Sequence, residues 1–145
     1  EGVESVNIIG LGKAGCAIAE KFGQHSQYKI FQIDVDKEGT RCYNIKKRKG
    51  PEEYEANTPS FKKFFGKIQG DTTFIIGGSG DISAMSLRII EQIRNKCDID
   101  ILYIVPDKSL LSEKRKMHEK VTYNVLQNYP ADMSGFKSAG RKYSR

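Results

Sequence analysis

The sequence predicts a three-layer α/β fold, in which a mainly parallel, doubly wound sheet carries helices on both faces. Two observations lead to this prediction. The segment Val6–Phe22 reads as a short apolar strand, a glycine turn and an amphipathic helix, and the same order recurs over Thr72–Lys96. Consecutive strands joined through a helix form right-handed parallel crossovers. The strands are expected to begin near Val6, Tyr28, Thr72 and Ile99.

The first unit carries the clearest functional signal. Val6-Asn7-Ile8-Ile9 has the length and branching of a buried strand, and Ala17, Ile18, Ala19 and Phe22 recur at helical spacing. Between them, residues 10–15 read Gly-Leu-Gly-Lys-Ala-Gly, which fits the pattern G-x-G-x-x-G. Such a turn presents backbone N–H groups and the positive end of a helix dipole to an anion. We predict a site for a nucleotide phosphate; the alternative is a turn that binds nothing.

The next segment contains an acidic residue at a spacing that is typical of dinucleotide-binding folds. Tyr28–Ile33 alternates in part and predicts a second strand, which ends at Asp34-Val35-Asp36. Asp34 lies nineteen residues beyond Gly15, where a dinucleotide-binding Rossmann fold carries its ribose-binding acid. Residues 37–60 are expected to form long connecting loops with one short strand around Cys42–Ile45.

A short helix is expected after these loops. Ser60 is a candidate N-cap for a helix over Phe61–Lys67. The spacing of Phe61, Phe64 and Phe65 places the three rings on one face, which predicts that they belong to the core rather than to a base-stacking surface.

The second unit repeats the first. Thr72–Ile76 predicts a strand, Gly77-Gly78-Ser79-Gly80 a turn, and Ser83–Lys96 an amphipathic helix. In a doubly wound sheet both glycine turns fall at the carboxyl edge, where ligands bind. Two turns on one edge could hold a polyphosphate from two sides; the alternative for the second turn is a tight connection.

The last predicted elements are a strand over Ile99–Val105 and a long helix from Ser112, as N-cap, through Gln127. Its stripe of Met117, Val121 and Val125 at i, i+4 and i+8 is expected to face the core. Glu119 is then expected to lie in water, and His118 to be a surface residue. Pro130 is expected to stop the helix.

Composition and length set the outer limits. The chain of 145 residues predicts one domain, with a nucleotide-binding α/β domain over residues 1–130 and a basic flexible tail or truncated connection over 131–145. Three widely spaced cysteines argue against a disulfide framework and for a cytoplasmic setting. The apolar runs are too short to predict a membrane span or a membrane partner.

The net charge of +6 is concentrated in the middle of the chain. Residues 37–67 hold nine bases against four acids. The run Lys46-Lys47-Arg48-Lys49 is expected to be a solvated loop, and the alternative is a surface that attracts nucleic acid.

Four segments together resemble the FtsZ and tubulin-like GTPases. Residues 10–17 are similar to the family's first glycine loop, approximately GVGGAGCN, and residues 33–36 stand where the family carries a strand that ends in Asn-Thr-Asp. Residues 74–80 look like the strand and signature loop GGGTGTG. Residues 105–117 are similar to the segment TKPFxFEGKRRM that precedes a long helix. The matches follow the family's order and span roughly residues 5 to 129.

The resemblance implies binding of GTP or GDP with Mg²⁺. The backbone of Gly10–Cys16 would hold the α- and β-phosphates, and Gly77–Gly80, with the Ser79 hydroxyl, would hold them from the other side. Asp36 would lie near the γ-phosphate and its Mg²⁺, while Glu113 and Arg115 would contact ribose and phosphate. The implied nucleotide-binding residues are Gly10, Leu11, Gly12, Lys13, Ala14, Gly15, Cys16, Asp34, Asp36, Gly77, Gly78, Ser79, Gly80, Asp81, Glu113 and Arg115.

Several positions depart from the family pattern. Lys13 replaces a glycine and can pair with a phosphate or face solvent. Ala17 replaces an asparagine, and Asp81 would repel bound phosphates unless a metal or a base offsets it. The family's catalytic acids come from a second domain, so filament assembly with GTP hydrolysis at subunit contacts requires elements that this sequence does not contain.

Two other functions fit parts of the sequence. A dinucleotide-binding module would hold NAD(P) at residues 10–15 with Asp34 on the ribose, and it leaves residues 77–80 without a role. A degenerate, non-catalytic nucleotide fold would serve as an interaction or nucleic-acid-binding module through residues 46–49.

Overall fold

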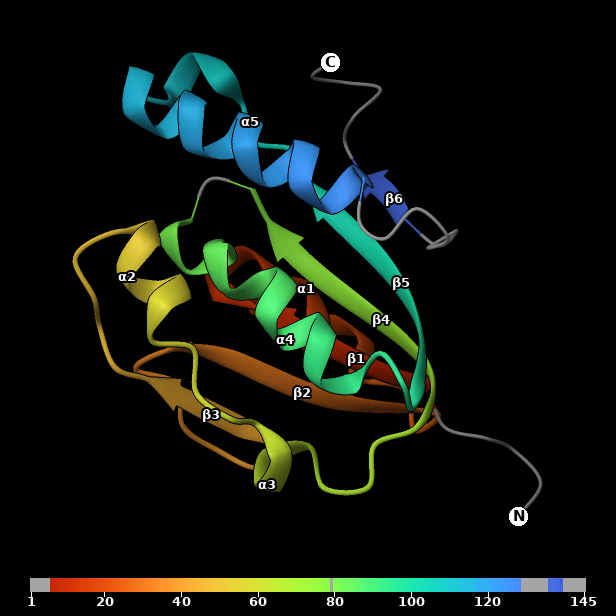
Figure 1. Ribbon diagram of the computed structural model, residues 1–145. Helices are drawn as coiled ribbons and strands as arrows, with labels where there is room; N and C mark the ends of the chain where they lie inside the picture. The colour runs from red at the N-terminus through yellow and green to blue at the C-terminus, as the bar shows by residue number, and fades with distance from the viewer. Residues whose placement is uncertain (1–5, 79, 129–135, 140–145) are drawn as a thin grey trace.

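The computed structural model describes residues 6–78, 80–128 and 136–139. Six strands form one sheet in the order β3-β2-β1-β4-β5-β6, and every neighbouring pair is parallel. This is the strand order of a doubly wound Rossmann sheet, so the predicted fold class is confirmed (Figure 1). The strands are β1 (Val6–Leu11), β2 (Tyr28–Val35), β3 (Cys42–Ile45), β4 (Gly70–Gly77), β5 (Cys97–Ile104) and β6 (Phe136–Ala139).

Helices cover both faces of the sheet, which gives three layers. Figure 1 shows α1 behind the sheet and α4 in front of it. The helices are α1 (Gly12–Phe22), α2 (Pro51–Ala56), α3 (Lys62–Phe65), α4 (Ser86–Ile93) and α5 (Glu113–Asn128), with 3₁₀ turns η1 (Asp81–Met85) and η2 (Lys108–Leu110).

Alternation along the strands produces two separate cores. In β1, Ile8 packs with Ala19 of α1 on one face of the sheet. The neighbouring Ile9 packs on the opposite face, in a larger core that includes Ile89 of α4 and Leu126 of α5. Successive strand side chains point to opposite faces, so each apolar residue of β1 contributes to one layer or the other.

The central position of β1 decides where a ligand can meet the sheet. Leu11, the last residue of β1, lies opposite Ile33 of β2 on one side and Ile76 of β4 on the other. The three strands therefore end at the same edge, and the two glycine turns that follow β1 and β4 leave the sheet side by side.

Several predicted elements are confirmed. The strand at Cys42–Ile45 has the predicted bounds, and Ser112 caps α5 because its hydroxyl accepts a hydrogen bond from the Arg115 N–H at 3.2 Å. Phe61 and Phe65 are buried, with Phe64 packed against them, as the spacing of the three rings predicts.

The region predicted as long loops contains a helix. Residues 51–56 form α2, with Pro51 in the first turn followed by Glu52 and Glu53. Proline at the start of a helix loses no hydrogen bond, and acidic residues there complement the helix dipole. These signals are present in the sequence, but they do not depend on the apolar periodicity from which the other helices were predicted.

The boundaries of two other helices differ from the prediction. The helix after β3 and α2 is a single turn whose N-cap is Phe61 rather than Ser60. The segment predicted as one helix over Ser83–Lys96 begins as the 3₁₀ turn η1, and its α-helical part ends at Ile93.

The prediction of which face of α5 is buried is wrong. Met117 and Val121 are 64% and 52% exposed, whereas Glu119, expected in water, is fully buried. The buried side also carries Tyr123 and Leu126. In this orientation the ring of Tyr123 packs edge-on against Tyr103 of β5, a contact that the predicted orientation would lose.

A sixth strand corrects the expectation that no regular element follows residue 130. Residues 136–139 form β6, which pairs in parallel with β5 from Ile101 to Ile104. The expected end of the helix at Pro130 lies outside the described residues, and the division of the chain at that residue stays a prediction. Among the described helices, none has the length and apolar character needed to cross a membrane.

Candidate functional site

The first glycine turn is held in place by direct backbone packing. A Cβ atom on Gly15 would collide with the carbonyl oxygen of Ile75 in β4, and one on Gly10 would lie 2.6 Å from the carbonyl oxygen of Gly15. Real Cβ atoms do not approach backbone atoms so closely. The first and third glycines of the pattern are thus required for α1 to pack on β1 and β4, whatever the turn binds.

The second glycine of the pattern has a different role. Gly12 has a φ of +79°, which favours glycine, and it begins α1. The N-cap, Leu11, offers no side-chain acceptor, and the first turn contains no acidic residue. Lys13 and Ala14 are exposed. Within the first turn of α1, no carboxylate competes with an external anion for the positive end of the helix dipole.

The second glycine turn lies against the first. A Cβ atom built on Gly77 would be 3.0 Å from the Cβ of Ala14, in the first turn of α1. Gly78 donates its N–H to the carbonyl oxygen of Ile104 at 3.0 Å, and a Cβ there would collide with the ring hydroxyl of Tyr103. Ser79, the predicted phosphate-binding hydroxyl, lies outside the described residues.

The acidic residue after the second turn has a basic partner. Arg115 of α5 donates to the Asp81 carboxylate, with 2.7 Å between Nη1 and Oδ1. This pair partly neutralises the carboxylate that would otherwise repel phosphates. Glu113, the other predicted residue of α5, is almost fully exposed and pairs with Lys116 at 3.2 Å. The structure thus brings Arg115, and not Glu113, to the second turn.

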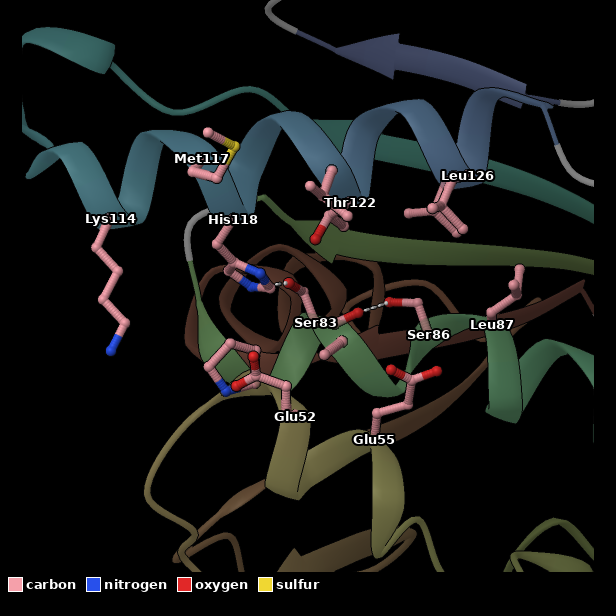
Figure 2. A pocket seen from close by; sticks show the side chains of 14 residues that line it. Glu52, Glu55, Ser83, Ser86, Leu87, Lys114, Met117, His118, Thr122 and Leu126 are labelled. Carbon is pink, nitrogen blue, oxygen red and sulfur yellow. Dashed lines mark hydrogen bonds between the residues drawn. The ribbon is translucent and has the colours of Figure 1, made fainter.

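A histidine that was expected at the surface fixes the same turn. The Nε2 atom of His118 lies 3.0 Å from the carbonyl oxygen of Gly80 and 3.3 Å from the hydroxyl of Ser83 (Figure 2). Because a carbonyl oxygen only accepts, Nε2 carries the proton. Ser83 donates its own proton to Gly80 at 2.6 Å, so His118 is not a general base for this serine. The pair anchors the turn.

The acidic loop after β2 is only partly at the site. Asp34 follows Ile33, whose carbonyl oxygen accepts a hydrogen bond from the Cys16 thiol of α1 at 3.6 Å. Asp36 is exposed, with a φ of 57°, and its N–H donates to Asn44. The role of Asp36 near a γ-phosphate and Mg²⁺ stays a prediction.

A three-residue network ties this loop to α1. Glu20 of α1 accepts hydrogen bonds from Lys37 at 2.7 Å and from Gln32 at 2.9 Å. The hydrogen bond from Lys37, followed by that from Gln32, lowers the pKa of Glu20 below its ordinary value. The same contact raises the pKa of Lys37. These bonds hold the segment that follows Asp34 against the helix.

The thiol of Cys16 is part of the packing rather than of the chemistry. Burial, together with the nearby Asp34 carboxylate, raises the pKa of Cys16 to about 12. The thiolate is the reactive form of cysteine. Cys16 is therefore inert at neutral pH, although it belongs to the predicted phosphate-binding loop.

We expect native protein at pH 8 to react with iodoacetamide at the half-buried Cys42 and to leave Cys16 unmodified. Folding raises the pKa of Cys16 above the ordinary thiol value of 9.0. The contribution of the buried thiol to stability is therefore full below pH 9 and is lost as the pH rises toward 12. Peptide mass spectrometry over a time course measures the labelling, with urea-unfolded protein as the control. Equal rates at the two cysteines in native protein would contradict the burial of Cys16.

Metal ligands and the basic run give no further site. Within residues 6–78, 80–128 and 136–139, there is no group of three or more His, Cys, Asp or Glu that could hold a metal ion. A Mg²⁺ bound through phosphate oxygens, as the resemblance implies, needs fewer protein ligands. Lys46, Lys47 and Lys49 are exposed, as expected of a solvated loop.

Sequence reasoning missed a buried polar pair beneath the site. Tyr103 of β5 donates its hydroxyl to the Oε2 atom of the fully buried Glu119 at 3.0 Å. Tyr103 also packs edge-on against Tyr123. The signal that could have found the pair is the second stripe of α5, residues 119, 122, 123 and 126, at the spacing i, i+3, i+4 and i+7.

The geometry defines a class: a doubly wound α/β domain with two adjoining glycine turns at the carboxyl edge of its sheet. No family model matches the chain, and no curated protein matches it. Solved structures do match. One is a short chain dehydrogenase family protein from Francisella tularensis subsp. tularensis SCHU S4, with a TM-score of 0.49 and 11% identity over 84% of this chain. The alignment spans 60% of that structure. The fold assignment rests on the strand order of this chain itself.

Proposed function

We propose that the chain binds a nucleotide through its phosphate groups, between the two glycine turns. One observation carries the proposal: Gly77 of the second turn adjoins Ala14, in the uncapped first turn of α1. Backbone N–H groups at a helix start favour an anion, and the second turn supplies a further backbone wall at the same place. Arg115 pairs with Asp81, which reduces the repulsion that this carboxylate would exert on a phosphate.

A guanine nucleotide with Mg²⁺ is the first candidate. It gives a role to both turns, since they adjoin at Ala14 and Gly77, and it agrees with the resemblance to the FtsZ and tubulin-like GTPases. The position of Arg115 beside Asp81 supports it, because the segment that carries Arg115 is one of the four on which the resemblance rests. On this proposal, filament assembly and GTP hydrolysis require a further domain.

A dinucleotide such as NAD(P) is the second candidate, and a separate observation favours it. Asp34 is the penultimate residue of β2 and follows Ile33, whose carbonyl oxygen is hydrogen-bonded to the Cys16 thiol of α1; Rossmann domains carry the acid that binds the ribose hydroxyls of NAD near the end of this strand. Under this reading the second turn is a tight connection that His118 fixes.

Thermal unfolding separates the two candidates. Millimolar GTP or GDP with Mg²⁺ is expected to raise the melting temperature by several degrees, because a ligand at about 100 times its Kd stabilises the folded state by about 2.7 kcal/mol. NADH at the same concentration is expected to leave it unchanged. A shift with NADH alone would establish the second candidate, and no shift with any of the three would overturn the proposal.

A matched pair of variants tests the location. Ala14→Asp places a carboxylate in the first turn of α1, where it favours the helix dipole but repels phosphate. We expect a melting temperature equal to that of the wild type without ligand, and no shift with nucleotide. Asn95→Asp makes the same charge change at an exposed residue before β5, at the opposite edge of the sheet, and should keep the full shift. Equal shifts in both variants would place the ligand elsewhere.

A further inference from the structure

A groove runs along α5 on the side of the molecule that carries α4. Its volume is about 430 Å³, and α2, η1, α4 and α5 form its walls (Figure 2). The apolar lining comes mainly from α5, through Met117, Val121, Val125 and Leu126, with Leu87 of α4 opposite. We call this the α5 groove. Ser83 and His118 also line it, and no residue of the two glycine turns does.

The upper wall of the α5 groove is also a ridge. Met117, Val121 and Val125 are 64%, 52% and 42% exposed, and their i, i+4 and i+8 spacing aligns them along one side of the helix. Contiguous exposed apolar surface marks a place where another molecule binds. A ridge that directly adjoins a groove of the same apolar character is the arrangement that a two-fold symmetric contact needs.

The charges on the two walls have opposite signs. Lys114 lines the groove from α5, and Glu52 and Glu55 line it from α2 (Figure 2). Glu55 has an exposed partner in Arg88 at 3.7 Å. A partner segment of a single sign would be attracted to one wall and repelled by the other. The surface of this chain itself is complementary to both walls, because it carries a base beside the apolar ridge on α5 and acids on α2.

We propose that a second copy of this chain occupies the α5 groove. Exposed side chains of the α5 ridge of each copy enter the groove of the other, so that the apolar ridges pack together and Lys114 of one copy approaches the α2 acids of its partner. A helix of sixteen residues is about 24 Å long. Packing of two such helices removes the exposed apolar side chains Met117, Val121 and Val125 of both copies from water.

Sedimentation velocity of the full chain between about 1 and 200 μM tests the proposal, in buffer without nucleotide or divalent cations so that nucleotide-dependent association does not contribute. The wild type is expected to shift from monomer to dimer over this range. Val121→Asp is expected to stay monomeric with an unchanged melting temperature, since its side chain is half exposed in the single chain. Leu110→Asp introduces the same charge at a more exposed apolar residue outside the groove, and it should dimerise as the wild type does.

A charge exchange tests the pairing of the two walls. Lys114→Glu and Glu52→Lys are each expected to weaken dimerisation at least tenfold, and the double variant to recover most of the loss. A wild type that remains monomeric at 200 μM would overturn the proposal. The proposal would be overturned even if the groove of that monomer bound a foreign peptide. A Val121→Asp variant that dimerises as strongly as the wild type would also overturn it. Neither result bears on nucleotide binding at the glycine turns.

Discussion

Gly15→Ala is expected to lower the free energy of unfolding by about 3 kcal/mol, the upper end of the range for overpacking in a close-packed interior. The added Cβ would collide with the carbonyl oxygen of Ile75 in β4. A backbone carbonyl in a central parallel strand cannot move without disturbing its pairing with β1 and β5. The variant is therefore expected to lift α1 away from the sheet, and urea unfolding followed by circular dichroism measures the loss.

Gly80→Ala is the matched control, because a Cβ at Gly80 meets nothing within 4 Å. Its free energy of unfolding is expected to stay within about 0.5 kcal/mol of the wild type, as is usual for substitutions away from packed features. If the two variants had equal stability, the close packing of α1 on β1 and β4 would be wrong, and with it the position of the first glycine turn.

Tyr103→Phe is expected to cost about 1–3 kcal/mol, the range for a buried polar group that loses a hydrogen-bond partner. The hydroxyl that it removes donates to the buried Oε2 atom of Glu119. Water cannot replace that donor at a carboxyl group that is fully buried. Urea unfolding at pH 7 measures the change.

Tyr43→Phe serves as the comparison. Tyr43 is partly buried and packs its ring edge-on against Phe61 and Phe64, so that removal of its hydroxyl keeps the ring contacts. We expect a change below about 0.5 kcal/mol. A loss at Tyr103 no greater than that at Tyr43 would show that the hydroxyl of Tyr103 does not support Glu119.

The sheet could be predicted because the signals of each central strand lie within the strand and the glycine turn that follows it. Val6–Ile9 and Thr72–Ile76 are short, branched and bounded by glycine, and strands buried on both faces need no other signal. The parallel order then follows from the helices between them. Strand β6 could not be found in this way, because its segment, Phe-Lys-Ser-Ala, has neither branching nor alternation. Pairing with β5 defines it.

The orientation of α5 shows where periodicity fails. The helix carries two stripes: Met117, Val121 and Val125 on one side, and Tyr123 and Leu126 on another. Periodicity alone selects the stripe with more aliphatic residues. The structure buries the other, because Tyr123 meets Tyr103 of β5. That contact joins residues twenty positions apart and cannot be seen in a single helix pattern.

The part of the candidate site that consists of backbone, namely the two glycine turns, could be predicted from the sequence. The glycine turns and their common edge follow from two local motifs and from the rule that parallel strands end together. The side chains around them depend on contacts between distant elements. Arg115 reaches Asp81 across thirty-four residues, and His118 reaches Gly80 across thirty-eight. Arg115 was expected at the site only through the family resemblance, and nothing in the local sequence distinguishes His118 from its neighbours in α5.

The close packing at Gly10 and Gly15 bears on how such motifs are interpreted in other chains. Selection for folding alone would preserve both residues, because a methyl group at either position collides with the main chain. Gly12 is constrained as well, because its φ of +79° favours glycine and a Cβ there would lie 3.0 Å from the side chain of Ile82. A descendant that had lost its ligand would therefore still display all three glycines, so the pattern in a related chain is evidence for the packed turn and not, by itself, for a bound nucleotide.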